Sequence, residues 1–373
     1  MSAIRKLFRH PDPYDTENTN ELFLAAMREN LIFQYENCPE YRMILDSLGF
    51  SPDMTVKYED IANIPPLPTL FLKRHRLHSM PPGKCPVTAT SSGTSGSFSE
   101  VSYDLQSLLC GFNMVLKVFG RHGILSPCPA NYVILGYKPH RSNRTAAAKT
   151  AYGFTFCAPA LSRTFALKHE NGGYIPDPDG VINAIEKYSR SPFPTRFMGF
   201  PAYMFFTLKL MAERGIRVNL PERSMIMLGG GWKEFYREQP DKQFFYGLAK
   251  DILGIPESRI HESYGAAEHP ILYCDCKAHR FHIPVYSRVI IRDVNTLKPL
   301  GFGETGLVNL LTPMIRATPV LSVITDDLGV LHEGSECSCG NKSTYLELIG
   351  RAGVKDIKTC AAGAERLLHE ITR

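Results

Sequence analysis

The run from Thr90 to Ser97 consists entirely of small residues, most of which carry a hydroxyl group. Glycines let a backbone approach a ligand closely, and successive N–H groups and hydroxyls can point inward as donors to phosphate oxygens. The Lys-Ser/Thr pair of a Walker motif does not follow Gly96, which excludes a P-loop NTPase. We interpret the run as a cradle for a triphosphate, and the alternative is a flexible Ser/Gly linker. The candidate phosphate-binding residues are Ser91, Ser92, Gly93, Thr94, Ser95 and Gly96.

Further glycine- or carboxylate-bearing motifs follow this loop in a fixed order. They are Leu228-Gly229-Gly230-Gly231-Trp232-Lys233, Ser263-Tyr264-Gly265-Ala266-Ala267-Glu268, Thr325-Asp326-Asp327-Leu328 and Ile349-Gly350-Arg351. Each motif alone is also typical of an ordinary turn: three glycines after a strand, or two aspartates at a hairpin corner. Their order along the chain is therefore more informative than any one of them.

Clustered cysteines indicate a metal site. Two C-x-C pairs lie about sixty residues apart, and histidines follow the first pair. Four thiolates, or three and one imidazole, close a tetrahedral structural zinc shell. The candidate ligands, of which four would bind, are Cys274, Cys276, His282, Cys337 and Cys339. The alternatives are free buried thiols or a redox-labile pair. A DNA-binding zinc finger is excluded because no recognition helix of suitable spacing accompanies them.

Cys360 stands apart from these pairs, near the C-terminus and between Lys355, Lys358 and small residues. Nearby cations lower the pKa of a thiol and favour the nucleophilic thiolate, and small neighbours let a segment move. We interpret Cys360 as a candidate nucleophile, and the alternative is a buried core cysteine.

The remaining sequence predicts the elements that must position these residues. Hydrophobic periodicity and caps predict helices over residues 20–37, 104–119, 202–213 and 244–253. Apolar runs predict strands over residues 132–135, 197–199, 225–228 and 288–291. Residues 64–68 are proline-rich and predict an extended connector. Alternating strands and helices imply an α/β fold with a parallel or mixed sheet, helices on both faces and ligands at the carboxyl ends of strands. Shorter strands and turns from about residue 286 predict a β-rich lobe.

Composition limits the possible classes of protein. The chain has 373 residues, 44% of them hydrophobic, which is enough for a large core. Its net charge of +5 includes no block of like charge, so nucleic acid is not an expected partner. No apolar run approaches the ~18 residues of a membrane span, and no signal peptide is recognised. Mostly isolated cysteines favour a reducing cytoplasm.

The order of these motifs resembles the adenylate-forming superfamily. Within it the chain is most similar to the acyl-protein synthetases of the LuxE family, and more distantly to phenylacetate-CoA ligases. The resemblance begins at Cys38-Pro39-Glu40-Tyr41 and Ile64-Pro65-Pro66-Leu67-Pro68, and it runs to Cys360. It implies a large N-terminal domain of the adenylate-forming fold over residues 1–350, with the β-rich lobe at about 286–348, and a short C-terminal arm over 351–373.

The resemblance also implies roles for the motif residues. The loop from Ser91 to Gly96 would hold the phosphates of ATP, Gly229 to Gly231 would flank the adenine, and Tyr264 with Gly265 would lie against it. Glu268 would reach Mg²⁺ and Asp327 would accept the ribose hydroxyls, roles that suit carboxylates. Phenylacetate-CoA ligase-like proteins are similar in having a Cys/His metal site between the same motifs.

The sequence departs from the superfamily after Ile349-Gly350-Arg351. Members normally continue into a swivelling domain that supplies a catalytic lysine, whereas here about twenty residues follow. We therefore expect this chain to lack most of the swivelling domain. The cation that stabilises the transferring phosphoryl group would come from Lys233, Arg351, Lys355 or Lys358.

Together with these residues, the resemblance implies an ATP-dependent, Mg²⁺-using acyl-protein synthetase with structural zinc. It would activate a carboxylic acid, such as a fatty acid, to acyl-AMP, capture the acyl group on Cys360 and pass it to an acyl reductase partner. One alternative is a ligase that delivers the acyl group to coenzyme A. Another is a zinc-stabilised binding or scaffold module with a decayed ATP site.

Overall fold

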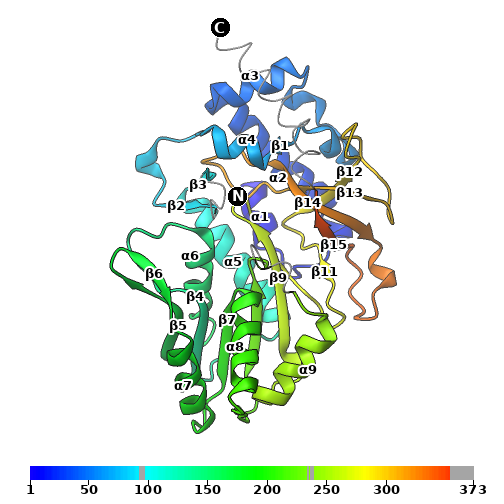
Figure 1. The fold of residues 1–373 in the computed structure, drawn as a ribbon. Coiled ribbons are helices and arrows are strands. Elements are labelled where there is room, and N and C mark those ends of the chain that lie inside the picture. Colours follow the sequence, from blue (N-terminus) through cyan, green and yellow to red (C-terminus); the bar gives the residue numbers. More distant parts are fainter. Residues whose placement is uncertain (92–96, 233–234, 236–238, 353–373) are drawn as a thin grey trace. The chain divides into compact units, whose positions relative to one another are not determined.

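The computed structural model describes residues 1–91, 97–232, 235 and 239–352 of the chain. The chain divides into two compact units, whose elements are labelled in Figure 1. The first unit combines Met1–Arg121 with the segment that begins at Gly265, and the second is His122–Tyr264. The boundary between a large domain and a C-terminal arm at residue 350 remains a prediction.

Helices occupy the N-terminal part of the first unit. They are α1 (Ala3–Phe8), α2 (Asn20–Asn37), α3 (Pro39–Ser47) and α4 (Thr69–Arg74), with 3-10 turns η1 (Glu17–Thr19), η2 (Pro52–Met54), η3 (Tyr58–Asn63) and η4 (Pro82–Lys84). The predicted helix over residues 20–37 is confirmed. It buries Phe23, Met27 and Leu31, which recur every four residues along one face. Pro39 begins α3 at its first position, where a missing N–H breaks no helical hydrogen bond.

The β-rich lobe lies in the first unit. Its sheet has the order β11-β15-β14-β13-β12, and β1 pairs with β14. The strands are β1 (Leu67–Pro68), β11 (Phe281–His282), β12 (Arg288–Arg292), β13 (Thr305–Leu311), β14 (Ser322–His332) and β15 (Tyr345–Arg351). The predicted strand over residues 288–291 is confirmed as β12. The proline-rich segment is extended, as predicted, and two of its residues also pair in parallel with Val323 and Ile324.

A two-stranded ribbon precedes and follows the glycine-rich loop. β2 (Val87–Thr90) pairs antiparallel with β3 (Glu100–Tyr103), and Thr90 lies opposite Glu100. Helix α5 (Leu105–Arg121) follows directly. Asp104 caps it by accepting a hydrogen bond from the Ser107 amide at 3.0 Å, as the sequence predicts. The first unit also contains β10 (His269–Cys274) and η7 (Gly334–Glu336).

A mixed sheet forms the centre of the second unit, with the order β9-β8-β7-β4-β5-β6. Its strands are β4 (Ala130–Tyr137), β5 (Ala160–Glu170), β6 (Gly173–Pro176), β7 (Thr195–Gly199), β8 (Met225–Gly229) and β9 (Ile260–Ala266). Neighbours are parallel from β9 to β5, and β6 is antiparallel. The strands predicted over residues 132–135, 197–199 and 225–228 are confirmed within β4, β7 and β8.

Helices cover both faces of this sheet. They are α6 (Ala146–Phe154), α7 (Pro178–Ser189), α8 (Pro201–Glu213) and α9 (Lys242–Leu253), followed by η6 (Glu257–Arg259). Val133 and Leu135 of β4 share one core cluster with buried residues of α7, α8 and α9. Side chains alternate along a strand, so Tyr132 points to the opposite face, where its ring meets Phe154 of α6 edge-on at 6.0 Å. The predicted helices over 202–213 and 244–253 are confirmed as α8 and α9.

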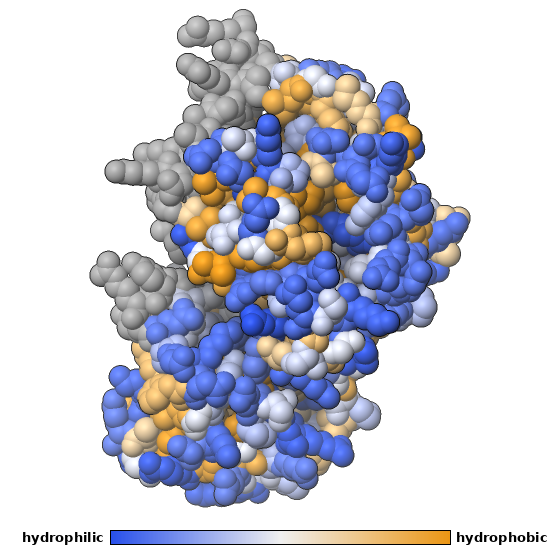
Figure 2. Space-filling view, turned by 90° about the vertical axis from the view of Figure 1, so that its right-hand side faces the viewer, coloured by the Kyte–Doolittle hydropathy of each residue, from blue (hydrophilic) through white to orange (hydrophobic). Residues whose placement is uncertain are grey.

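The surface is mixed in character. Figure 2 shows one face of the molecule, on which hydrophilic residues surround smaller hydrophobic patches. Exposed apolar atoms of this kind are usual for globular proteins. Of the helices that the structure describes, none combines the length and the apolar character that a membrane span requires.

Candidate functional site

The two ends of the glycine-rich loop are joined to each other. The amide of Ser91 donates to the carbonyl oxygen of Ser99 at 3.1 Å, and the amide of Ser99 donates to the Ser91 hydroxyl at 3.0 Å. The first bond joins the two backbones next to the β2–β3 ribbon, and the second is accepted by the Ser91 side chain. The predicted phosphate-binding residues between them lie outside the described residues: Ser92, Gly93, Thr94, Ser95 and Gly96.

Glu268 is a buried carboxylate that contacts one end of this loop. Only 4% of its surface is exposed, and it accepts a hydrogen bond from the Ser99 hydroxyl. Burial raises the pKa of Glu268, because loss of water disfavours the charged form. The Ser99 hydrogen bond and the positive charge of Lys73 lower this pKa, whereas Asp326 raises it. A cation bound at Glu268 would favour the ionised carboxylate in the same way as Lys73.

Two residues of this arrangement, Lys73 and Ser99, are not identified by the sequence analysis. Lys73 lies in α4 and begins a basic run that ends at Arg76. The guanidinium of Arg76 lies over the ring of Phe98, 5.8 Å from its centroid, so the run borders the loop. That basic run ahead of the loop is the signal that could have identified Lys73. Ser99 has no such signal, because its contact with Glu268 joins positions 169 residues apart.

The predicted adenine-flanking glycines stand where β8 ends. Gly230 and Gly231 have φ angles of +83° and +66°, which residues with a side chain rarely adopt. A Cβ atom on Gly230 would lie 2.8 Å from the Phe200 ring, and one on Gly229 would lie 2.6 Å from the Ser263 hydroxyl oxygen. Glycine is therefore favoured by both conformation and space at Gly230, and by conformation alone at Gly231. The carboxyl end of a strand in a parallel sheet is the usual place for a ligand.

Tyr264 and Gly265 both lie on β9, and the chain passes from the second unit to the first between them. Tyr264 is partly exposed and Gly265 is exposed. A Cβ atom on Gly265 would lie 3.2 Å from the carbonyl oxygen of Ile271. The backbone at Gly265 is therefore closely packed just before the turn that carries Glu268.

Asp327 and Arg351 are paired across the β14–β15 ladder. Arg351 Nε lies 3.3 Å from Asp327 Oδ1, and the Asp327 side chain is 18% exposed against 72% for Arg351. Arg351 is therefore largely exposed, whereas Asp327 is partly buried. The other predicted cations are Lys233, Lys355 and Lys358, and the predicted nucleophile is Cys360. All four lie outside the described residues.

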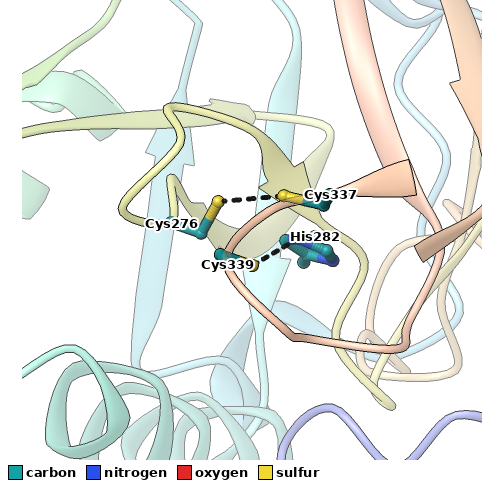
Figure 3. Close-up of side chains that lie close together, drawn as sticks. All are labelled: Cys276, His282, Cys337 and Cys339. Atoms are coloured by element: carbon teal, nitrogen blue, oxygen red, sulfur yellow. Dashed lines mark hydrogen bonds between the residues drawn. The ribbon is translucent and has the colours of Figure 1, made fainter. Parts of the chain in front are cut away.

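Four of the five candidate zinc ligands come together in the first unit (Figure 3). Their donor atoms all lie within 4.8 Å of one another, and they belong to Cys276, His282, Cys337 and Cys339. The sulfurs of Cys276 and Cys337 are 3.7 Å apart, and the sulfur of Cys339 is 3.2 Å from His282 Nε2. The fifth candidate, Cys274, is fully buried and does not belong to this group.

The surroundings of this cluster suit a tetrahedral metal. Zinc–sulfur bonds of about 2.3 Å put two thiolates roughly 3.8 Å apart, close to the observed spacing. The Nδ1 atom of His282 lies 2.7 Å from the Ser343 carbonyl oxygen, which leaves Nε2 directed at the cluster. Burial raises the pKa of Cys276 to about 12, since a buried thiolate lacks hydration. A bound cation reverses that preference, because it stabilises thiolates.

Known proteins match nearly the whole chain. Residues 2–368 match the family model described as Acyl-protein synthetase, LuxE. A long-chain-fatty-acid–luciferin-component ligase from Aliivibrio fischeri is 24% identical over 96% of this chain and 92% of its own length. A phenylacetate-coenzyme A ligase from Thermus thermophilus is 23% identical over 90% of this chain and 71% of its own length.

Solved structures give the same fold. An open conformation of 2-hydroxyisobutyryl-CoA ligase, in complex with 2-HIB-AMP and CoA, aligns with a TM-score of 0.69 at 13% identity. The alignment covers 91% of this chain and 76% of that one. The predicted adenylate-forming fold class is therefore confirmed, and the family match identifies the enzyme class as a ligase that forms acyl-AMP. The chain belongs to the LuxE family of acyl-protein synthetases.

Proposed function

We propose that this ligase activates a long-chain fatty acid with ATP and captures the acyl group on its own Cys360. The acid's carboxylate oxygen attacks the α-phosphorus of ATP, pyrophosphate leaves, and a mixed acyl–AMP anhydride forms. The Cys360 thiolate then attacks the acyl carbon, a thioester forms and AMP leaves. An acyl reductase would receive the acyl group. The contact between Ser99 and Glu268 carries the proposal, because it joins the phosphate loop to the predicted metal-binding carboxylate.

Glu268 suits a magnesium ion that is bound together with phosphate. Mg²⁺ uses few protein carboxylates and takes further oxygens from the nucleotide. When bound, the ion would neutralise negative charge on the phosphates. This chain would supply Glu268 as the ligand and Ser91 with the rest of the loop as hydrogen-bond donors. The charge of Lys73, close enough to lower the pKa of Glu268, favours anionic phosphates in the same place.

We propose the remaining nucleotide contacts from the resemblance of the motifs. Gly229 to Gly231 would leave room for the adenine, Tyr264 would stack on it, and Asp327 would accept the ribose hydroxyls. Cys360 follows Ala352 by eight residues, so an extended chain allows it to lie up to about 27 Å away. Ala352 itself is held beside Asp326 by a 2.9 Å backbone hydrogen bond. A thiol on the C-terminal arm can therefore reach an adenylate held at Asp327.

Asp327→Asn is expected to raise the KM for ATP about tenfold while kcat changes little, because a neutral amide accepts ribose hydroxyls more weakly than a carboxylate. Steady-state kinetics at saturating acid measure both constants. Asp179→Asn is the matched control, since Asp179 also pairs with an arginine, Arg214, at 2.6 Å. An unchanged KM in Asp327→Asn would remove the ribose role.

Coenzyme A is the alternative acyl acceptor. Two of the similar proteins are named coenzyme A ligases, and one of them was solved with CoA bound. In that case Cys360 would be dispensable, and acyl-CoA would accumulate when CoA is added. The fatty acid itself is proposed from the name of the Aliivibrio fischeri ligase.

Acid-dependent exchange of pyrophosphate into ATP tests the activation step. Straight-chain acids of about two to eighteen carbons are compared at equal concentration, with Mg²⁺ present and then removed by chelation. The proposal predicts exchange with the longer acids that stops without Mg²⁺. Absence of exchange with every acid in folded protein would favour a binding or scaffold module.

We further propose that Cys276, His282, Cys337 and Cys339 bind a structural zinc ion. Their donor set and spacing fit a closed tetrahedral shell, and no water position is left for catalysis. The ion would tie β11, which carries His282, to the segment between β14 and β15 that carries two of the cysteines. Its expected contribution is to stability.

Freshly purified, reduced protein is expected to contain about one zinc per chain. Cys339→Ser should lose the zinc and melt several degrees lower, whereas pyrophosphate exchange at low temperature should change little. Elemental analysis and thermal denaturation measure these outcomes. Cys85→Ser, which alters a cysteine outside the cluster, should keep the zinc. A zinc-free wild-type protein would contradict the assignment.

A further inference from the structure

The Ser99 hydroxyl is the direct link between the loop and Glu268. Ser99 is 1% exposed, and each of its three polar groups makes a hydrogen bond. Its amide and carbonyl oxygen bond to Ser91, while its hydroxyl donates to Glu268 Oε1. The backbone of Ser99 is thus held by the opposite end of the loop, and its side chain is left to contact the carboxylate.

A carboxylate that binds a metal must present one oxygen in a defined direction. An ionised carboxylate has two equivalent oxygens and about four lone-pair positions, so a single fixed donor selects its orientation. In a buried site water does not compete for that donor. The backbone of the donor, Ser99, is hydrogen-bonded to Ser91. The orientation of the Glu268 carboxylate therefore depends on the bonds between Ser91 and Ser99. Phosphate binding by the loop and metal binding by Glu268 therefore both involve the hydrogen-bonded pair Ser91 and Ser99.

We propose that Ser99 is a positioning residue that aligns Glu268 for the metal ion held with the nucleotide phosphates. This inference rests on the proposed function, since it assigns Glu268 to the metal. Ser99 contacts neither the acid nor the reacting phosphorus in this account. Its loss weakens metal use and leaves the acid's own affinity unchanged.

Ser99→Ala tests the proposal through two readouts. The first is the affinity for ATP, measured by calorimetry across a Mg²⁺ series without acid, and Mg²⁺ should enhance this affinity less in Ser99→Ala than in the wild type. The second is the Mg²⁺ dependence of pyrophosphate exchange. The Mg²⁺ concentration that gives half-maximal exchange is expected to rise about tenfold, the effect of one hydrogen bond to a charged group. The KM for the acid should stay within twofold of the wild-type value. Ser102→Ala is the matched control, because Ser102 is equally buried on β3 and its hydroxyl contacts Thr88, 3.3 Å away. It should leave the Mg²⁺ dependence unchanged.

A double-mutant cycle separates positioning from a general structural effect. If Ser99 acts through Glu268, then adding Ser99→Ala to Glu268→Gln should lower the residual exchange no further. Equal Mg²⁺ dependence in wild type and Ser99→Ala, or full additivity in the cycle, would overturn the proposal. If Ser99→Ala does not fold, Ser99→Cys replaces it, and its weaker donor should raise the half-maximal Mg²⁺ concentration about threefold.

Failure of this inference is distinguishable from failure of the proposed function. If wild type and Ser102→Ala both show no exchange with any acid, the activation step itself is wrong and the inference falls with it. If both are active and Ser99→Ala matches them, only the positioning role is wrong.

Discussion

Glu268→Gln is expected to lower acid-dependent pyrophosphate exchange by about a hundredfold or more, because a preorganised charge at the phosphates would be lost. Glutamine keeps the size of the side chain and an acceptor oxygen for Ser99, but it loses the negative charge that binds Mg²⁺. The deficit should shrink as Mg²⁺ is raised, since a weaker site fills at higher concentration. Exchange rates measured across a Mg²⁺ series give both effects.

Glu262→Gln is the control for this substitution. Glu262 lies on β9, shortly before the turn that carries Glu268, and its carboxylate pairs with Lys242 at 3.1 Å. Its loss should leave the exchange rate and the Mg²⁺ dependence unchanged. A Glu268→Gln enzyme with the wild-type rate at every Mg²⁺ concentration would exclude Glu268 as the metal ligand.

Cys360→Ala is expected to abolish the acyl-protein while leaving acyl-adenylate formation intact, since adenylation needs only the nucleotide site. With radiolabelled acid and ATP, the wild type should carry label that neutral hydroxylamine removes, as thioesters are labile to it. Cys360→Ser should carry label that resists the same treatment, because an oxygen ester is more stable. Denaturing gels before and after hydroxylamine distinguish these states.

Cys128→Ala controls for loss of a thiol elsewhere, and it should be labelled like the wild type. Label that persists on a thiol of Cys360→Ala would move the acyl carrier to another cysteine. If no variant and no wild-type protein becomes labelled, and acyl-CoA forms when CoA is added, the results would favour a coenzyme A ligase.

Local signals in the sequence predicted four of the helices, α2, α5, α8 and α9, and parts of four strands, β4, β7, β8 and β12. The helix over residues 20–37 follows from its apolar spacing and from Pro39, and Asp104 identifies the start of α5. The buried strands of the second unit are apolar runs, because helices cover both faces of their sheet. β4 extends beyond the predicted range at both ends, β7 begins earlier at Thr195 and β8 ends later at Gly229, because ladder pairing continues past the apolar residues.

The division into two units could not be predicted from the sequence. The first unit is formed by two separate stretches of the chain, and β9 crosses between the units without a change in composition. Linkers rich in glycine, proline or serine are the usual sign of a boundary. A continuous strand provides none of these signals.

The sequence identified individual candidate site residues, but it did not predict which side chains they contact. The spacing of cysteines identified five candidate zinc ligands, and only the fold shows that Cys274 lies outside the cluster. Glu268 was found from its motif, whereas its partner Ser99 depends on how the loop ends close. Such contacts arise from tertiary packing between distant segments, which local patterns do not encode.

The mass of the intact protein after incubation with Mg²⁺, ATP and a long-chain fatty acid tests the central claim most directly. The mass should rise by that of one molecule of the acid less one water, the increase should require ATP, and hydroxylamine should reverse it. The added mass should also follow the chain length of the acid supplied. An unchanged mass in folded protein that exchanges pyrophosphate would contradict capture of the acyl group by the enzyme's own thiol.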